Sequence, residues 1–230
     1  MNISATLNVF KLIRDPALCL PHHTIPSFNQ LPIPLSRAFK SKNGEKEVDI
    51  RAVILDKDNC FAAPHQNEVY KPYNDKFEEL RRAYPGSRLL IVSNSAGTSS
   101  DPSNSEAELL ERNTGVKVLR HTTKVSILLN LSSLNGLKSP GPIIDCGVLD
   151  ILTQPQKPGC RAEVLDYFRS ATNGDVTSAK QIAVVGDRLF TDIMMANMMG
   201  SYGVWVKDGV TEEKSLVSFN RYLLDATNGS

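Results

Sequence analysis

Five short apolar runs constrain the fold of this chain more than any other sequence feature. They lie at residues 50–55, 88–92, 116–119, 181–185 and 203–206. Most apolar residues in them occupy consecutive positions, which predicts a sheet covered on both faces. Helical patterns separate the runs, at residues 75–84, 103–113, 161–170 and 190–199. Strands that alternate with helices in this way predict a doubly wound parallel α/β sheet of the Rossmann-like kind.

The composition fits one such domain. The chain has 230 residues, 41% of them hydrophobic and 22% charged, as in soluble globular proteins. Its net charge of +1 provides no field that would hold nucleic acid, so we expect no nucleic-acid partner. No apolar run approaches the roughly 18 residues that a transmembrane helix needs. The four cysteines have no metal-binding spacing, which favours reduced thiols.

Residues 1–48 are predicted to form an arm that precedes the α/β domain at 49–210. As a helix, residues 1–14 would be amphipathic, a pattern typical of a membrane interface or a mitochondrial targeting segment. A helix docked on the protein's own core would show the same pattern. Five prolines between residues 16 and 34 exclude a regular ladder or helix there and predict an extended arm. Residues 211–230 are expected to form a C-terminal helix or tail.

Polar residues that end the apolar runs mark the expected functional site, because ligands of open α/β sheets bind at the carboxyl ends of the strands. Asp56 and Asp58 end the first run, Ser93 ends the second, and Asp187 and Asp192 follow the fourth. Singly, each acid is more often a helix cap or a turn residue. Together at one edge they would repel one another unless a divalent cation neutralised them. An all-oxygen set of ligands predicts Mg²⁺ as the cofactor.

This combination of motifs, over residues 50–206, resembles the haloacid dehalogenase (HAD) superfamily of phosphatases. The resemblance implies that Asp56 is the nucleophile that forms an aspartyl-phosphate, and that Asp58 is the general acid and base. It also implies that Mg²⁺ is bound by the Asp56 carboxylate, the Asp58 carbonyl and Asp187. Asp192 would orient these ligands without binding the ion itself.

The same resemblance implies which residues bind the phosphoryl group. Ser93, next to Asn94, would hold it, and Lys157 would offset its charge and that of the nucleophile. The first motif departs from its commonest form at Asn59 and Cys60. We interpret Cys60 as a packing residue, because the sequence places no base beside it.

Three stretches narrow the resemblance to the fungal mitochondrial phosphatidylglycerophosphatases, namely residues 55–61, residues 1–4 with 31–34, and residues 197–203. That family removes the terminal phosphate of phosphatidylglycerophosphate in cardiolipin biosynthesis. It works on the matrix side of the mitochondrial inner membrane. The resemblance therefore implies a phospholipid substrate and peripheral membrane contact through the N-terminal segment.

The short stretch after Cys60 leaves no room for the cap domain with which many HAD enzymes close over small metabolites. A capless site could accept a head group that is still seated in a bilayer. Basic residues near the amphipathic segment could hold the domain at that surface, although each alone is more often part of a solvated face. They are Lys11, Arg14, Lys40 and Lys42.

Other functions stay open at this point. One is the same chemistry on a soluble phosphate monoester, such as a sugar phosphate or nucleotide, which the capless site and apolar N-terminus disfavour. Another is a phospho-receiver-like domain, but its phosphoacceptor would follow the third run, where the chain has no acid. A non-catalytic scaffold is disfavoured because Asp56 and Asp58 are both present.

Residues 125–156 fit the predicted domain poorly, because they have few charges and no clear period. Without them Lys124 would join Lys157 in a short connection that looks like the third motif of the family. We expect a poorly ordered loop, with a retained intron or a small cap as alternatives. Lys157 would lie at the site, or Lys124 if the loop displaces it.

Overall fold

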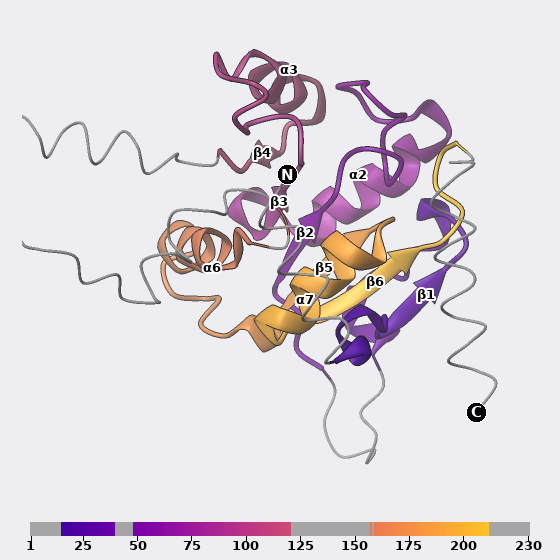
Figure 1. Ribbon diagram of the computed structural model, residues 1–230, viewed down its shortest axis with the longest axis vertical. Coiled ribbons are helices and arrows are strands. Elements are labelled where there is room, and N and C mark those ends of the chain that lie inside the picture. The colour runs from indigo at the N-terminus through magenta and orange to yellow at the C-terminus, as the bar shows by residue number, and fades with distance from the viewer. Residues whose placement is uncertain (1–14, 40–47, 121–156, 158, 212–230) are drawn as a thin grey trace, which may run out of the picture.

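The computed structural model describes residues 15–39, 48–120, 157 and 159–211. They form a six-stranded parallel sheet in the order β1-β6-β5-β2-β3-β4 (Figure 1). The strands are β1 (His23–Ile25), β2 (Ala52–Leu55), β3 (Leu89–Ile91), β4 (Lys117–Val118), β5 (Ile182–Gly186) and β6 (Tyr202–Val206). The helices are α2 (Asn74–Ala83), α3 (Ser105–Thr114), α6 (Arg161–Ala171) and α7 (Met194–Met199). The predicted α/β class is confirmed.

Several predictions concern residues outside the described part of the chain. These are the amphipathic helix at 1–14, the segment at 125–156 and the C-terminal helix or tail, of which only residue 211 is described. Lys124 and the four basic residues of the N-terminal region also lie outside it. Between β2 and α2, where every residue is described, the chain holds loops and a 3₁₀ turn at Lys71–Tyr73 but no cap domain, as predicted.

Helices cover both faces of the sheet, which explains why the strands lack alternation. In β2, Val53 and Leu55 belong to the same hydrophobic cluster as residues of α2 and α3. Ala52 and Ile54 point to the opposite face and cluster with residues of α6 and α7. Figure 1 shows α6 and α7, in orange, apart from α2 and α3. Every residue of β2 is therefore buried.

The N-terminal arm contributes an edge strand to the sheet. Residues His23–Ile25 pair in parallel with β6. The expectation that the prolines exclude any ladder is therefore wrong for this strand, because Pro21 and Pro26 flank it and do not interrupt it. The rest of the arm forms 3₁₀ turns at Pro16–Cys19, Phe28–Gln30 and Leu35–Ala38. Apolar residues of the arm are buried in the core beside α2, including Phe28, Leu31 and Leu35.

The helix expected over residues 190–199 has two parts. A π-helical turn at Leu189–Ile193 leads into α7, which ends at Met199 and is followed by Gly200 with φ of 75°. Met194 and Met195 are fully buried, as expected of core residues. The wide π turn matters for function because such turns often occur at functional sites. Here it turns the side chain of Asp192 into the protein interior.

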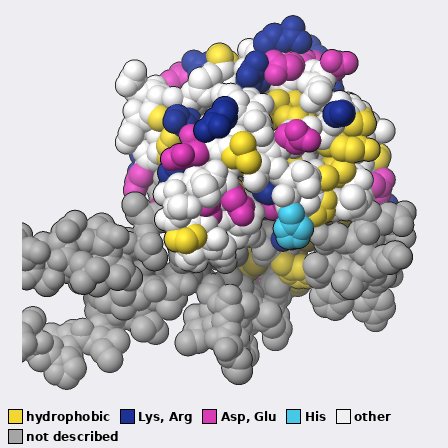
Figure 2. Space-filling view, turned by 90° about the horizontal axis from the view of Figure 1, so that it is seen from above, with side chains coloured by type: hydrophobic (Ala, Val, Ile, Leu, Met, Phe, Trp, Pro, Cys, Tyr) yellow, Lys and Arg dark blue, Asp and Glu magenta, His cyan; other side chains and the backbone are white. Residues whose placement is uncertain are grey.

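Two observations bear on how the described part of the chain could meet a membrane. None of the described helices is long and apolar enough to cross a membrane. On the face drawn in Figure 2, acidic and basic side chains are interspersed over the described residues. This mixture agrees with the balanced composition of the chain.

Candidate active site

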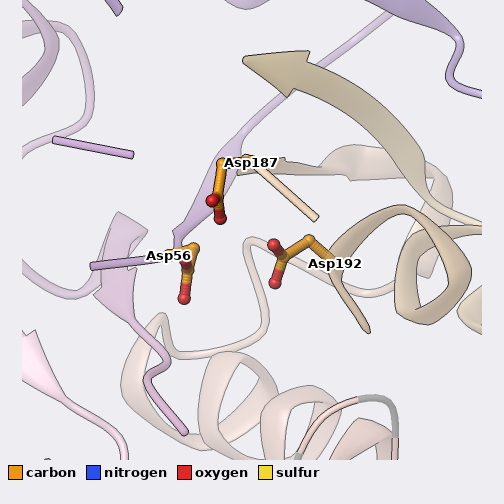
Figure 3. Close-up of side chains that lie close together, drawn as sticks. All are labelled: Asp56, Asp187 and Asp192. Atoms are coloured by element: carbon orange, nitrogen blue, oxygen red, sulfur yellow. The ribbon is translucent and has the colours of Figure 1, made fainter. Parts of the chain in front are cut away.

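Three buried carboxylates meet at the carboxyl ends of β2 and β5. Asp56 directly follows β2, while Asp187 and Asp192 follow β5, the neighbouring strand. One oxygen of each carboxylate lies within 4.8 Å of the others, as Figure 3 illustrates. The sheet order brings these acids together, because adjacent parallel strands end at the same edge.

Lys157 lies among these carboxylates. Its Nζ donates hydrogen bonds to Asp56 Oδ1 and, at 2.5 Å, to Asp192 Oδ1. Its side chain is only 1% exposed. Burial alone would lower the pKa of Lys157, but the two carboxylates outweigh that effect and raise it. The lysine is therefore positively charged, and it is the lysine that the structure brings to the cluster.

One lysine does not neutralise three carboxylates. Burial and the charges of Asp56 and Asp192 raise the pKa of Asp187 to about 9. Burial and the charge of Asp56 raise the pKa of Asp192 to about 6, against the opposing effect of Lys157. Asp187 Oδ1 is buried and has no hydrogen-bond partner among the described residues. A divalent cation would relieve this excess charge, and the oxygen-only donors fit Mg²⁺.

Asp58 has a different set of partners and does not belong to the carboxylate cluster. Its Oδ1 accepts a hydrogen bond from the His65 backbone N–H at 2.9 Å and pairs with Lys57 Nζ at 2.8 Å. Its Oδ2 accepts a hydrogen bond from Ser95 Oγ at 3.1 Å. Burial would raise the pKa of Asp58, but Lys57 and the other donors lower it. The side chain is 20% exposed, so it is more accessible to solvent than those of Asp56 and Asp192.

The loop after β3 connects these two groups of residues. Ser93 is fully buried, and its Oγ lies 3.0 Å from Ser95 Oγ. Asn94 Oδ1 accepts a hydrogen bond from the backbone N–H of Lys157 at 3.2 Å. Sequence analysis predicted Ser93 and Asn94 at this edge, but it gave no role to Ser95 or Lys57.

Other residues that hold the site were also missed. Asn59 adopts a left-handed conformation with φ of 62°, and its Nδ2 lies 3.4 Å from Asp187 Oδ2. Its Oδ1 accepts a hydrogen bond from Val210 N at 3.0 Å. Trp205 Nε1 donates to the carbonyl of Asp187 at 2.8 Å. The departure of the first motif at Asn59 was the signal that could have indicated this role.

Cys60 is buried in the core and is not placed for chemistry. Burial, with the negative charges of nearby aspartates, raises its pKa well above the ordinary value for a thiol. A neutral thiol is a poor nucleophile, which agrees with the interpretation of Cys60 as a packing residue.

Gly186, the last residue of β5, is expected to be essential for the position of Asp192. A Cβ atom on Gly186 would lie 2.3 Å from Asp192 Oδ2, so Gly186→Ala must displace this carboxylate and disturb Lys157. We expect the rate of the reaction that this site catalyses to fall by about 10- to 100-fold. The free energy of unfolding should fall by about 1–3 kcal/mol, measured by denaturant titration.

Gly203→Ala is the matched control, because its Cβ would meet the side chains of Ile193, at 3.1 Å, and Ala196, at 3.3 Å, and no site residue. That variant should lose some stability and keep most of its activity. Full activity of Gly186→Ala would show that the carboxylate of Asp192 does not need its observed position.

Comparison with known proteins relates this site to one family. The chain matches the family model described as "Mitochondrial PGP phosphatase" over residues 3–128 and 144–211. All predicted site residues lie within these matched segments, and residues 129–143, inside the poorly fitting segment, lie between them. No solved structure matches the chain.

Two relatives cover most of the chain. It is 45% identical over 210 residues to the mitochondrial phosphatidylglycerophosphatase GEP4 of Saccharomyces cerevisiae, a match that covers 91% of this chain and 89% of the yeast protein. It is 32% identical over 211 residues to the "Probable phosphatidylglycerophosphatase, mitochondrial" of Schizosaccharomyces pombe, with 91% of this chain and 84% of that protein covered.

Proposed function

Because the chain belongs to the mitochondrial PGP phosphatase family, we propose that it removes the terminal phosphate of phosphatidylglycerophosphate in mitochondria, in cardiolipin biosynthesis. The product would be phosphatidylglycerol. One observation carries the chemistry of this proposal: Lys157 lies between Asp56 and Asp192 at the carboxyl edge of the sheet. A nucleophilic carboxylate beside a fixed positive charge is suited to attack on a phosphate group.

In the proposed reaction an oxygen of Asp56 attacks the phosphorus of the terminal phosphate. The bond between phosphorus and the glycerol oxygen breaks, and this oxygen takes a proton from Asp58. Phosphatidylglycerol leaves, and an aspartyl-phosphate remains. Asp58 then takes a proton from a water molecule, whose oxygen attacks phosphorus. The bond to Asp56 breaks, so inorganic phosphate and the free carboxylate are formed.

The residues around the nucleophile would bind and orient the phosphoryl group. Ser93, at the end of β3, would donate its hydroxyl to a phosphoryl oxygen, with Asn94 beside it. Lys157 would offset negative charge on the nucleophile and on the phosphoryl oxygens. The hydrogen bond from Lys157 N to Asn94 Oδ1 supports this assignment, because it ties the lysine to the loop that carries Ser93.

Mg²⁺ would be held by the carboxylates of Asp56 and Asp187 and by the backbone carbonyl of Asp58. When bound, it would supply positive charge that lowers the repulsion between the nucleophile and the phosphate. The unpartnered Oδ1 of Asp187 supports its role as a ligand. Asp192 accepts hydrogen bonds at both oxygens, from Lys157 Nζ and, at 3.1 Å, from Arg188 N. It is therefore assigned to orient the other groups.

The direct test of this function is phosphate release from phosphatidylglycerophosphate in vesicles. The same assay is run on soluble monoesters, such as sugar phosphates and nucleotides. The proposal expects the highest kcat/KM for the phospholipid. A higher kcat/KM for a soluble monoester would assign the same chemistry to a different substrate.

We further propose that the protein contacts the matrix side of the inner membrane as a peripheral protein, through residues 1–14. Deleting these residues is expected to weaken sedimentation with anionic vesicles, because the deletion removes an amphipathic pattern that carries basic residues. Hydrolysis of soluble p-nitrophenyl phosphate should be unchanged, since the segment precedes the site strands. Equal sedimentation of the full-length and truncated proteins would contradict the proposal.

A further inference from the structure

The hydroxyl group of Ser95 connects the two parts of the site. Ser95 Oγ donates a hydrogen bond to Asp58 Oδ2 at 3.1 Å and lies 3.0 Å from Ser93 Oγ. The backbone N–H of Ser95 also donates to Ser93 Oγ, at 3.1 Å. Ser95 thus joins the residue proposed to protonate the leaving group to the residue proposed to bind the phosphoryl group.

The contacts of Asp58 make its two oxygens unequal. Lys57 Nζ and the His65 backbone N–H, which can only donate, both face Oδ1. Oδ2 faces the hydroxyl of Ser95, which can donate or accept. Among the partners of Asp58 in the described residues, Ser95 alone can therefore adapt to a proton on Oδ2. Oδ2 is therefore the oxygen whose position depends on the hydroxyl of Ser95.

We propose that Ser95 is a positioning residue, which holds Oδ2 of Asp58 toward the leaving oxygen of a phosphate ester bound at Ser93. Ser95 acts through Asp58 and does not contact the reacting atoms. The inference rests on the proposed function, because it requires Asp58 to be the general acid. The chain between β2 and α2 holds no cap domain that could orient Asp58. Residues of the α/β domain itself, such as Ser95, are therefore left to orient it.

The test uses two phosphate esters that differ in their leaving groups. Phosphatidylglycerophosphate releases a strongly basic alkoxide that needs a proton, whereas p-nitrophenyl phosphate releases a weakly basic phenolate that does not. For both, kcat/KM is compared, because it includes steps only through formation of the aspartyl-phosphate. Ser95→Ala is expected to lower kcat/KM for the phospholipid by about 10- to 100-fold, and that for the aryl ester by less than about threefold.

Two further variants separate positioning from loop structure. Ser95→Thr keeps the hydroxyl and should restore most of the activity on the phospholipid. Thr98→Val removes two other hydrogen bonds of the same loop, from Thr98 Oγ1 to the Ser95 carbonyl at 2.7 Å and from Ser100 N to Thr98 Oγ1 at 3.2 Å. It should change kcat/KM for both substrates by the same factor. If Ser95→Ala also lowered kcat/KM equally for both substrates, or for neither, the inference would be overturned.

Asp58→Asn distinguishes failure of this inference from failure of the proposed function. Like Ser95→Ala, it should lower kcat/KM for the phospholipid far more than kcat/KM for the aryl ester. Adding Ser95→Ala to Asp58→Asn should lower kcat/KM for the phospholipid by less than about a further twofold. If Asp58→Asn affects both esters equally, the general-acid assignment is wrong and the inference is overturned with it. If Asp58→Asn is selective but the second mutation adds its full effect, only the role of Ser95 is overturned.

Discussion

Asp56→Asn is expected to abolish phosphate release, with a loss in kcat of about 10³-fold or more. An amide cannot replace the attacking carboxylate, although it has nearly the same volume. The fold should be retained, because the change nearly conserves the volume of the side chain and reduces the repulsion among the buried carboxyl groups. The measurement is the initial rate on phosphatidylglycerophosphate, with circular dichroism to verify folding. A variant that retained about a tenth of the wild-type rate would exclude the aspartyl-phosphate mechanism.

Asp101→Asn is the matched control for a buried aspartate outside the cluster. Asp101 accepts backbone hydrogen bonds from Gly97 N at 3.1 Å and Ala107 N at 3.0 Å, and so anchors the start of α3. Its substitution should lower the free energy of unfolding and leave the chemical step nearly intact. The two variants thus separate loss of a nucleophile from loss of a buried charge.

Removal of divalent cations is expected to abolish activity as completely as Asp56→Asn does. Excess EDTA should stop phosphate release and Mg²⁺ should restore it, while Ca²⁺ should restore little because its looser coordination misplaces the nucleophile. Mg²⁺ should also raise the Tm of the protein, because it would bind the folded carboxylate cluster and not the unfolded chain. Undiminished activity in excess chelator would overturn the metal assignment.

Asp187→Asn tests which residues bind the metal. It should raise the Mg²⁺ concentration needed for half-maximal activity and remove the increase in Tm, since it alters the carboxylate with an unpartnered oxygen. Asp175→Asn is the control, because Asp175 pairs with Arg51 and Arg88 outside the carboxylate cluster. Its response to Mg²⁺ should match that of the wild type.

The fold and the candidate site were predictable from sequence to the extent that local patterns encode them. Uninterrupted apolar runs such as β2 and β5 require cover on both faces, which only a sheet between helix layers supplies. The helices predicted at 103–113 and 190–199 are followed in the structure by Gly115 and Gly200, whose positive φ glycine easily adopts. Asp56 and Asp187 were found because the end of a strand is visible in sequence, and strand ends of a parallel sheet share one edge. Their roles in catalysis remain predictions.

Tertiary structure alone decided the contacts that complete the site. Lys157 and Asp56 are 101 residues apart in sequence, and Ser95 and Asp58 are 37 apart. Such contacts depend on strand order, on loop geometry and, for Asp192, on a π turn, none of which has a local signature. The edge strand His23–Ile25 was missed for the same reason, since a proline-rich arm pairs there only because β6 presents an open edge. The sequence by itself determined the layers and the strand ends, because they follow from local patterns of apolar and polar residues. The partners of Lys57, Ser95 and Asn59 were decided only by the tertiary structure, because they follow from the packing of separate segments of the chain.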